Sequence, residues 1–181
     1  MNPMKSNNEL AHHNTDLLKK AESIQCVITD IDGVLTDGRI FYTNQGETFT
    51  GFNIQDGLGI RYLLKHGITV AVLTGRKNPA VLHRMKDLGV DHVFQGLSNK
   101  VPAYESLLNM LKLTDNQVAY IGDDIPDYPI LKRVGLSVSP RDGNYRITQR
   151  VDWVTTAKGG EGAFREVADL LLEAKKIDVL G

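Results

Sequence analysis

Two aspartates separated by one residue, Asp30 and Asp32, follow the apolar run 26–28 and precede Gly33. A short apolar run bounded by glycine is typical of a buried strand. Carboxylates crowded at a strand end repel one another, so such a pair usually serves a cation or a reaction. Taken alone, the segment is better explained as a solvated turn, because Asp and Gly are common turn residues. Later segments favour the chemical interpretation.

A second apolar run, 70–73, leads directly into Thr74, Gly75 and Arg76. A hydroxyl with nearby backbone N–H groups can hold phosphate oxygens. The guanidinium adds a positive charge beside them. This segment predicts an anion site at the end of a strand.

A third apolar run, 118–121, leads into an acidic loop that contains Asp123, Asp124 and Asp127. Alone, these carboxylates would suit the N-terminus of a helix. Lys100 lies near the start of a helical pattern and, alone, would be a solvated helix residue. Order and spacing make these residues significant together.

The elements that position them alternate between strand and helix, which predicts an α/β fold with a Rossmann-like parallel sheet flanked by helices. Asp30, Thr74 and Asp123 all fall at the carboxyl ends of expected strands. In open α/β sheets these ends meet at the ligand crevice. Residues 39–52 have β-rich ends around Asn44, Gln45 and Gly46, and predict a projecting hairpin.

In order and spacing, the charged and hydroxyl residues resemble the signature motifs of the haloacid dehalogenase superfamily. The matching residues are Asp30, Asp32, Thr74, Lys100, Asp123 and Asp127. A closer resemblance, over about residues 24–172, is to the family of 3-deoxy-D-manno-octulosonate 8-phosphate (Kdo 8-phosphate) phosphatases. It rests on the segments TDIDGVLTDG, NIQDGLGI, LTGRK, QGLSNK, YIGDDIPD and GGEGAFRE. The chain has a short end after Leu172, where some members of the family continue into a longer tail.

The resemblance implies a phosphatase in which Asp30 attacks phosphorus and forms an aspartyl phosphate. Asp32 would protonate the leaving sugar oxygen and then deprotonate the attacking water. Thr74, with the amide of Gly75, would hold phosphate oxygens, and Lys100 would neutralise phosphate and nucleophile. The dehalogenase branch of the superfamily has no need of this second acid, so the carboxylate of Asp32 argues against that branch.

A carboxylate nucleophile and a phosphate dianion repel one another, and Mg²⁺ is the natural remedy because it prefers oxygen ligands and keeps several waters. The resemblance assigns it the Asp30 carboxylate, the Asp32 backbone carbonyl and the Asp123 carboxylate. Asp127 would act from behind these ligands. Asp124 could do the same or cap a helix.

A sugar acid phosphate carries a carboxylate as well, so further cations are expected, and Arg76 is the best placed. The further substrate contacts expected are Asn53, Gln55, Asp56, Gly57, Arg61, Gly75, Arg84 and Lys100. Arg61 and Arg84 could equally be solvated helix residues. The family usually has Arg where this chain has Gln55, which weakens the match to Kdo 8-phosphate. Phosphatases of nine-carbon sugar acid phosphates tend to have Glu at the position of Arg76. The Arg in this chain therefore favours Kdo 8-phosphate again.

The chain has 181 residues and a formal net charge of -1, which suits one domain over residues 15–181 behind a mobile arm of residues 1–14. A helix is expected from about Asp16. The absence of basic runs and of a long apolar stretch disfavours nucleic acid and membrane as partners. Cys26, the single cysteine, falls in an expected strand, and the whole suits a cytoplasmic protein.

The intervals between the motifs are already used by a hairpin, helices and strands, so no cap domain is expected. In a lone hairpin, Phe41 and Phe49 would be exposed to water. This predicts a homo-oligomer, most simply a tetramer, whose subunits meet through the hairpin. The resemblance places residues 159–166, with Arg165, near a site, although a flexible lead into the last helix is an equal alternative. A phosphatase for another keto-sugar acid, or a non-catalytic oligomerisation module with this fold, are the competing functions.

Overall fold

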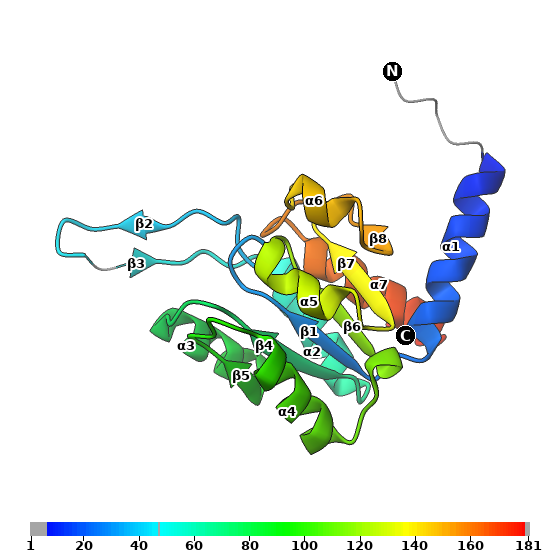
Figure 1. Ribbon diagram of the computed structural model, residues 1–181, viewed down its shortest axis with the longest axis horizontal. Coiled ribbons are helices and arrows are strands. Elements are labelled where there is room, and N and C mark those ends of the chain that lie inside the picture. Colours follow the sequence, from blue (N-terminus) through cyan, green and yellow to red (C-terminus); the bar gives the residue numbers. More distant parts are fainter. Residues whose placement is uncertain (1–6, 47, 180–181) are drawn as a thin grey trace.

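A six-stranded parallel sheet forms the centre of the computed structural model, which describes residues 7–46 and 48–179 (Figure 1). The strand order is β5-β4-β1-β6-β7-β8. The strands are β1 (Cys26–Thr29), β4 (Thr69–Leu73), β5 (His92–Phe94), β6 (Val118–Ile121), β7 (Leu136–Ser139) and β8 (Trp153–Val154). The α/β prediction is confirmed. β1 lies between β4 and β6, so the segments that follow these strands share one edge of the sheet.

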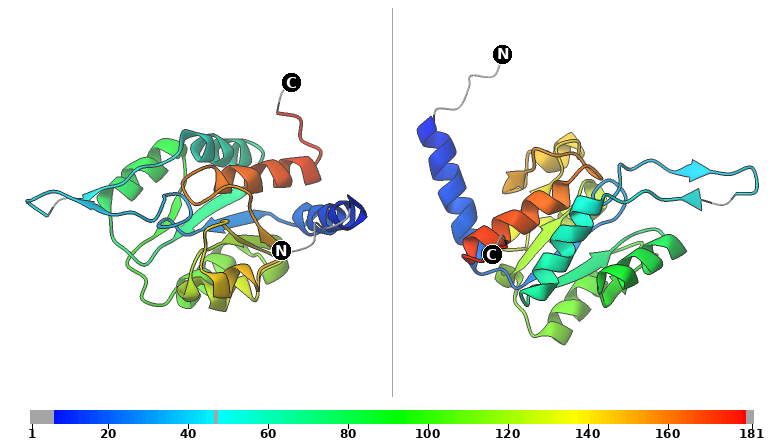
Figure 2. Two further views of the ribbon diagram at one scale, coloured as in Figure 1. Left: turned by 90° about the horizontal axis from the view of Figure 1, so that it is seen from above. Right: turned by 180° about the vertical axis from the view of Figure 1, so that it is seen from behind.

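Helices cover both faces of the sheet (Figure 2). The helices are α1 (Asn7–Glu22), α2 (Ile54–Lys65), α3 (Pro79–Leu88), α4 (Val101–Leu111), α5 (Tyr128–Leu131), α6 (Tyr145–Thr148) and α7 (Ala163–Ala174), with 3-10 turns η1 (Asp115–Gln117) and η2 (Ile125–Asp127). Alternate strand residues point to opposite faces. Val27 therefore packs with α1, α2, α3 and α7, whereas Cys26 and Ile28 pack on the opposite face, with α4 and α5.

The hairpin of β2 (Phe41–Tyr42) and β3 (Thr48–Phe49) projects well beyond the body of the protein (Figures 1 and 2). Phe41 faces Phe49 across the two strands. Their exposed fractions are 55% and 63%, and Tyr42 is 68% exposed. The hairpin prediction is confirmed, and the part of the chain that the structure describes contains no cap domain.

Helix α1 begins at Asn7, earlier than the expected start near Asp16. The expected arm therefore overlaps a helix over residues 7–14, and residues 1–6 lie outside the described part; its mobility stays a prediction. Cys26 is buried, and burial raises the pKa of its thiol to about 12, which keeps it unreactive. Among residues 7–46 and 48–179, no helix is long and apolar enough to cross a bilayer.

Candidate active site

A cavity of about 350 Å³ opens at the carboxyl ends of the three central strands. It brings together most residues for which the sequence predicts chemistry: Asp30, Asp32, Thr74, Gly75, Arg76, Lys100, Asp123, Asp124 and Asp127. Asp30 follows β1, Thr74 follows β4 and Asp123 follows β6. Because parallel neighbours end at the same edge, the fold places these side chains around one space.

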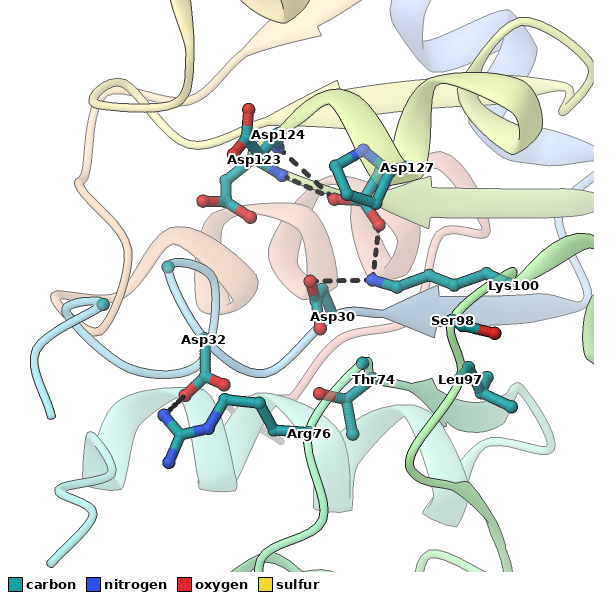
Figure 3. A pocket seen from close by; sticks show the side chains of 14 residues that line it. Asp30, Asp32, Thr74, Arg76, Leu97, Ser98, Lys100, Asp123, Asp124 and Asp127 are labelled. Atoms are coloured by element: carbon teal, nitrogen blue, oxygen red, sulfur yellow. Dashed lines mark hydrogen bonds and ion pairs between the residues drawn. The ribbon is translucent and has the colours of Figure 1, made fainter.

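Lys100 bridges two carboxylates at the floor of this cavity (Figure 3). Its Nζ lies 2.7 Å from Asp30 Oδ2 and 2.6 Å from Asp127 Oδ1. The Lys100 side chain is only 3% exposed. Burial would lower the pKa of Lys100, but Asp127 and Asp30 raise it above its usual value. The ammonium group is therefore charged, and it holds Asp30 in a fixed orientation.

The second Asp127 oxygen accepts hydrogen bonds from the backbone N–H groups of Asp123 (3.2 Å) and Asp124 (3.3 Å). Its first oxygen also accepts one from the buried Tyr120 hydroxyl, at 2.7 Å. Both oxygens of Asp127 are thus used inside the protein. This supports the expectation that Asp127 acts from behind the metal ligands. Asp124 caps η2 by accepting from Ile125 N and is exposed.

Carboxylate oxygens of Asp30, Asp123 and Asp127 lie within 4.8 Å of one another. Burial, then the charge of Asp127, raises the pKa of Asp30 to about 6. Burial, then Asp127 and Asp30, raises the pKa of Asp123 to about 7. Crowded oxygen ligands of this kind fit a hard divalent cation, which removes the repulsion between them. Asp127 is buried, at 1% exposed, whereas Asp30 and Asp123 are partly exposed, so Asp30 and Asp123 are the carboxylates that a cation in the cavity can reach.

Asp32 lies nearer the mouth of the cavity, where Arg76 Nη1 approaches its Oδ1 at 3.5 Å (Figure 3). About a third of each side chain is exposed. Asp32 can therefore exchange protons with a ligand or water that enters the cavity. Arg76 can contact an anionic group of a ligand that enters the cavity.

The loop after Asp30 is held in shape by Thr36. Its buried hydroxyl donates to Ile31 O and accepts from the N–H groups of Gly33 and Gly38, all at 3.3 Å. Gly33 has a φ of +84°, and a Cβ there would lie 2.2 Å from Asp123 Oδ2. Only glycine lets the backbone approach the acidic loop this closely.

A loop from the end of the chain packs against the same turn. A Cβ at Gly159 would lie 1.9 Å from Gly33 O, and Gly160 N donates to Val34 O at 2.9 Å. The expected segment 159–166 is thus in contact with the turn that carries Asp32, at Gly159 and Gly160. Arg165 lies outside the cavity: it pairs with Asp169 at 2.7 Å and stacks over Tyr62.

Several expected substrate contacts lie outside the cavity: Asn53, Gln55, Asp56, Gly57, Arg61 and Arg84. Asn53 caps α2 through Gln55 N and donates to Gly160 O. Arg61 is exposed and donates to Asp87 O at the end of α3. The contact of all six with substrate stays a prediction, and Asn53 and Arg61 have hydrogen-bond partners within this chain.

Asp56 is buried against α7, which begins after Gly162 without a side-chain cap of its own. Asp56 Oδ1 accepts from Arg165 N at 2.8 Å. Burial raises the pKa of Asp56 to about 6, although hydrogen bonds from backbone N–H groups at the start of α7 act to lower it. The carboxylate therefore caps a helix that follows more than a hundred residues later. Arg84 packs over Gly57, where a Cβ would meet its Nη2 at 2.3 Å.

The cavity also includes residues that the sequence did not single out: Gly33, Gly38, Leu97, Ser98 and Pro126. Thr36 and Tyr120 support it from below. Gly33, Ser98 and Pro126 lie within two residues of a predicted site residue, Leu97 lies three residues before Lys100, and Tyr120 is in the strand before Asp123. Proximity to the motifs was thus an available signal, although it could not show which side chains face inward.

The fold and the carboxylate cavity are those of a haloacid dehalogenase-like hydrolase, and the model of that family matches residues 93–166. The 3-deoxy-D-manno-octulosonate 8-phosphate phosphatase KdsC of Escherichia coli K12 is 48% identical over 164 residues, 90% of this chain and 87% of that protein. The chain thus belongs to the 3-deoxy-D-manno-octulosonate 8-phosphate phosphatase family, whose members are phosphoric monoester hydrolases.

Solved structures agree with this assignment. The phosphatase of the same name from Yersinia pestis is 45% identical and superimposes with a TM-score of 0.88, over 89% of this chain and 87% of that one. The phosphatase from Moraxella catarrhalis, solved in complex with magnesium ion, phosphate ion and a KDO molecule, is 38% identical. Its TM-score is 0.87, over 90% of this chain and 93% of that one.

Proposed function

We propose that the protein hydrolyses Kdo 8-phosphate to Kdo and phosphate, with Mg²⁺, as a cytoplasmic step of lipopolysaccharide precursor synthesis. The observation that carries the proposal is the buried Asp30–Lys100–Asp127 chain beside Asp123, at the edge of a sheet shared with phosphatases of this name. The ligands of the Moraxella catarrhalis relative, a phosphate, a magnesium ion and the product sugar, are those such a cavity would receive.

In the proposed reaction, an Asp30 carboxylate oxygen attacks phosphorus while the bond from phosphorus to the sugar oxygen breaks. Asp32 gives its proton to that oxygen, because an alkoxide is a poor leaving group. Water then attacks the aspartyl phosphate, passes a proton to Asp32, and releases phosphate and the Asp30 carboxylate. Each turnover therefore consumes one water and leaves both carboxylates as they began.

Asp30, Asp123 and the Asp32 backbone carbonyl would hold Mg²⁺. When bound, the ion offsets the negative charge that gathers as the phosphoryl group is transferred. Lys100 adds a fixed positive charge 2.7 Å from Asp30 Oδ2. Thr74, which is 2% exposed, and Gly75 line the wall on which phosphate oxygens would rest.

Phosphate release from a panel of esters tests this function. The panel contains Kdo 8-phosphate, a nine-carbon keto-sugar acid phosphate, a hexose phosphate and p-nitrophenyl phosphate, each with and without Mg²⁺. We expect the highest kcat/KM for Kdo 8-phosphate. A preference for the nine-carbon ester would assign the protein to the neighbouring activity, and no release from any ester would favour a non-catalytic module.

Arg76→Glu should lower kcat/KM for Kdo 8-phosphate about a hundred-fold or more, and for p-nitrophenyl phosphate much less. Arg76 lies at the cavity mouth beside Asp32, where the carboxylate of the sugar acid could reach it. Arg150→Glu makes the same charge change outside this cavity, and should leave both values near those of the wild type. Equal losses on both esters from Arg76→Glu would mean that Arg76 serves the phosphate or the fold.

The open cavity also favours a homo-oligomer, for which a tetramer through the hairpin is our proposal. Water is usually excluded from phosphoryl-transfer sites, and the residues that the structure describes form no cap for the purpose. Phe41 and Phe49, which pair across the hairpin, are exposed aromatic side chains of the kind that subunit contacts bury, and Tyr42 on the same hairpin is exposed as well.

Replacing both Phe41 and Phe49 with Lys should dissociate the assembly and raise KM for Kdo 8-phosphate. Light scattering measures the mass, and steady-state kinetics measures KM at the same protein concentration. Leu82→Lys, which alters another exposed apolar residue on α3, is the matched control. A fully active wild-type monomer at assay concentration would contradict this proposal.

A further inference from the structure

Tyr120 is a fully buried residue of the central strand β6 whose hydroxyl reaches the catalytic cluster from below. It donates to Asp127 Oδ1 at 2.7 Å. The same oxygen accepts from Lys100 Nζ at 2.6 Å. Tyr120 does not line the cavity, so it cannot touch a bound substrate.

Asp127 connects two separate parts of the cavity. Through Oδ1 it holds Lys100, which in turn contacts Asp30 Oδ2. Through Oδ2 it accepts from the backbone N–H groups of Asp123 and Asp124. A rotation of this one carboxylate would therefore displace both the buried ammonium group and the loop that carries Asp123.

A carboxylate group turns readily about the bond to its Cβ unless hydrogen bonds of fixed direction hold it, since terminal torsions of this kind have broad minima. The Lys100 ammonium group is on a flexible side chain and is shared with Asp30. It can therefore move together with the Asp127 carboxylate and does not fix that carboxylate in place. The Tyr120 ring, by contrast, is fixed in the core on a central strand. Its hydroxyl is the rigid side-chain contact of Asp127.

We propose that Tyr120 is a positioning residue, which fixes the Asp127 carboxylate and thereby the place of Lys100 beside the nucleophile and of the Asp123 loop. The inference rests on the proposed phosphatase function. Without the hydroxyl, Asp127 Oδ1 would keep only Lys100 as a partner, and the ammonium group would be drawn toward Asp127 and away from Asp30.

The test compares two substitutions of the same kind, Tyr120→Phe and Tyr104→Phe. Tyr104 is also fully buried and also donates to a carboxylate, Asp115 Oδ1, at 2.6 Å, but neither Tyr104 nor Asp115 lines the cavity. Each variant removes one buried hydroxyl and keeps the ring. The loss of general core stability should therefore be similar, and melting temperatures measure it.

Tyr120→Phe should lower kcat about ten-fold on both Kdo 8-phosphate and p-nitrophenyl phosphate, with KM within about two-fold of the wild type. Calorimetric titration with Mg²⁺, in the absence of any ester, should show a dissociation constant several-fold weaker than the wild-type value. Tyr104→Phe should change none of these quantities. Because the comparison includes a generic ester, it stays informative if Kdo 8-phosphate proves not to be the substrate.

The proposal is overturned if kcat of Tyr120→Phe stays within about two-fold of the wild type, or if Tyr104→Phe loses as much. An unchanged Mg²⁺ dissociation constant would refute the hold on the Asp123 loop. A Tyr120→Phe protein that unfolds below the assay temperature would assign the residue to core stability instead.

Discussion

Asp30→Asn is expected to lower kcat roughly 10⁴-fold or more, because the amide cannot form the covalent intermediate. Asp30 is the carboxylate that Lys100 orients from below, and Ile31 N holds its other oxygen at 2.6 Å. Asp127 also contacts Lys100 and backbone N–H groups, but its side chain is 1% exposed, whereas that of Asp30 is 14% exposed and can be reached from the cavity. Phosphate release measured with excess enzyme would detect even a small residual rate.

The fold should survive this substitution. Burial and Asp127 raise the pKa of Asp30 to about 6, above the value expected in the unfolded chain. A carboxyl group whose pKa is higher in the folded protein stabilises the metal-free fold less as pH rises from about 4 to about 6. At neutral pH, the ionised Asp30 therefore lowers the stability of the metal-free protein. The neutral amide removes that cost, and metal-free Asp30→Asn should melt no lower than the wild type at about pH 7.5.

The control is Asp91→Asn, an exposed aspartate before β5 and outside the cavity. It should keep wild-type kcat. Near-normal turnover by a folded Asp30→Asn protein would refute the covalent mechanism, whichever ester is used.

Asp123→Ala is expected to abolish most activity at millimolar Mg²⁺ and to raise sharply the Mg²⁺ concentration that gives half-maximal rate. Of the acidic side chains within 4.8 Å of one another, Asp127 is the buried one, which leaves Asp123 as the main partner of Asp30 for the ion. Removing one of two carboxylate ligands weakens a Mg²⁺ site strongly, since the ion binds proteins through few such contacts.

Treatment with EDTA followed by titration with Mg²⁺ measures this requirement, and the Mg²⁺-induced rise in melting temperature measures binding without substrate. The wild type should show both responses and Asp123→Ala neither at the same ion concentration. The Asp91→Asn control should behave as the wild type does. Full wild-type activity in EDTA would remove the metal from the proposed function.

The catalytic cavity was predictable from the sequence because its position depends on local features. Apolar runs that end in Asp30, Thr74 and Asp123 define strands, and the alternation with helices implies that they are parallel. Parallel neighbours then bring their ends together whatever the details of packing. Lys100 lies in the same cavity for a similar reason, since it directly precedes the helix that returns to β6.

The outer contacts depend on packing between distant segments, which a single sequence does not reveal. From the sequence, Asp56 belongs to a loop that could contact substrate. In the structure it caps α7 by accepting a hydrogen bond from Arg165 N. Tyr120 was read only as part of an apolar strand, because nothing local shows that its hydroxyl faces Asp127. The sequence predicts too late a start for α1, because the polar run at the beginning of this helix has no clear apolar face.

The contact of Gly159 and Gly160 with the turn after Asp30 has a consequence for protein engineering. Gly159 leaves no room for a methyl group beside Gly33 O, so the two loops fit only as a pair. The two loops are far apart in the sequence. In a chimera that takes the first motif from one relative and the last loop from another, the contacting loop surfaces would not have evolved together and could clash. Grafts, circular permutants and recombination libraries built on this scaffold should therefore inherit both loops from one parent.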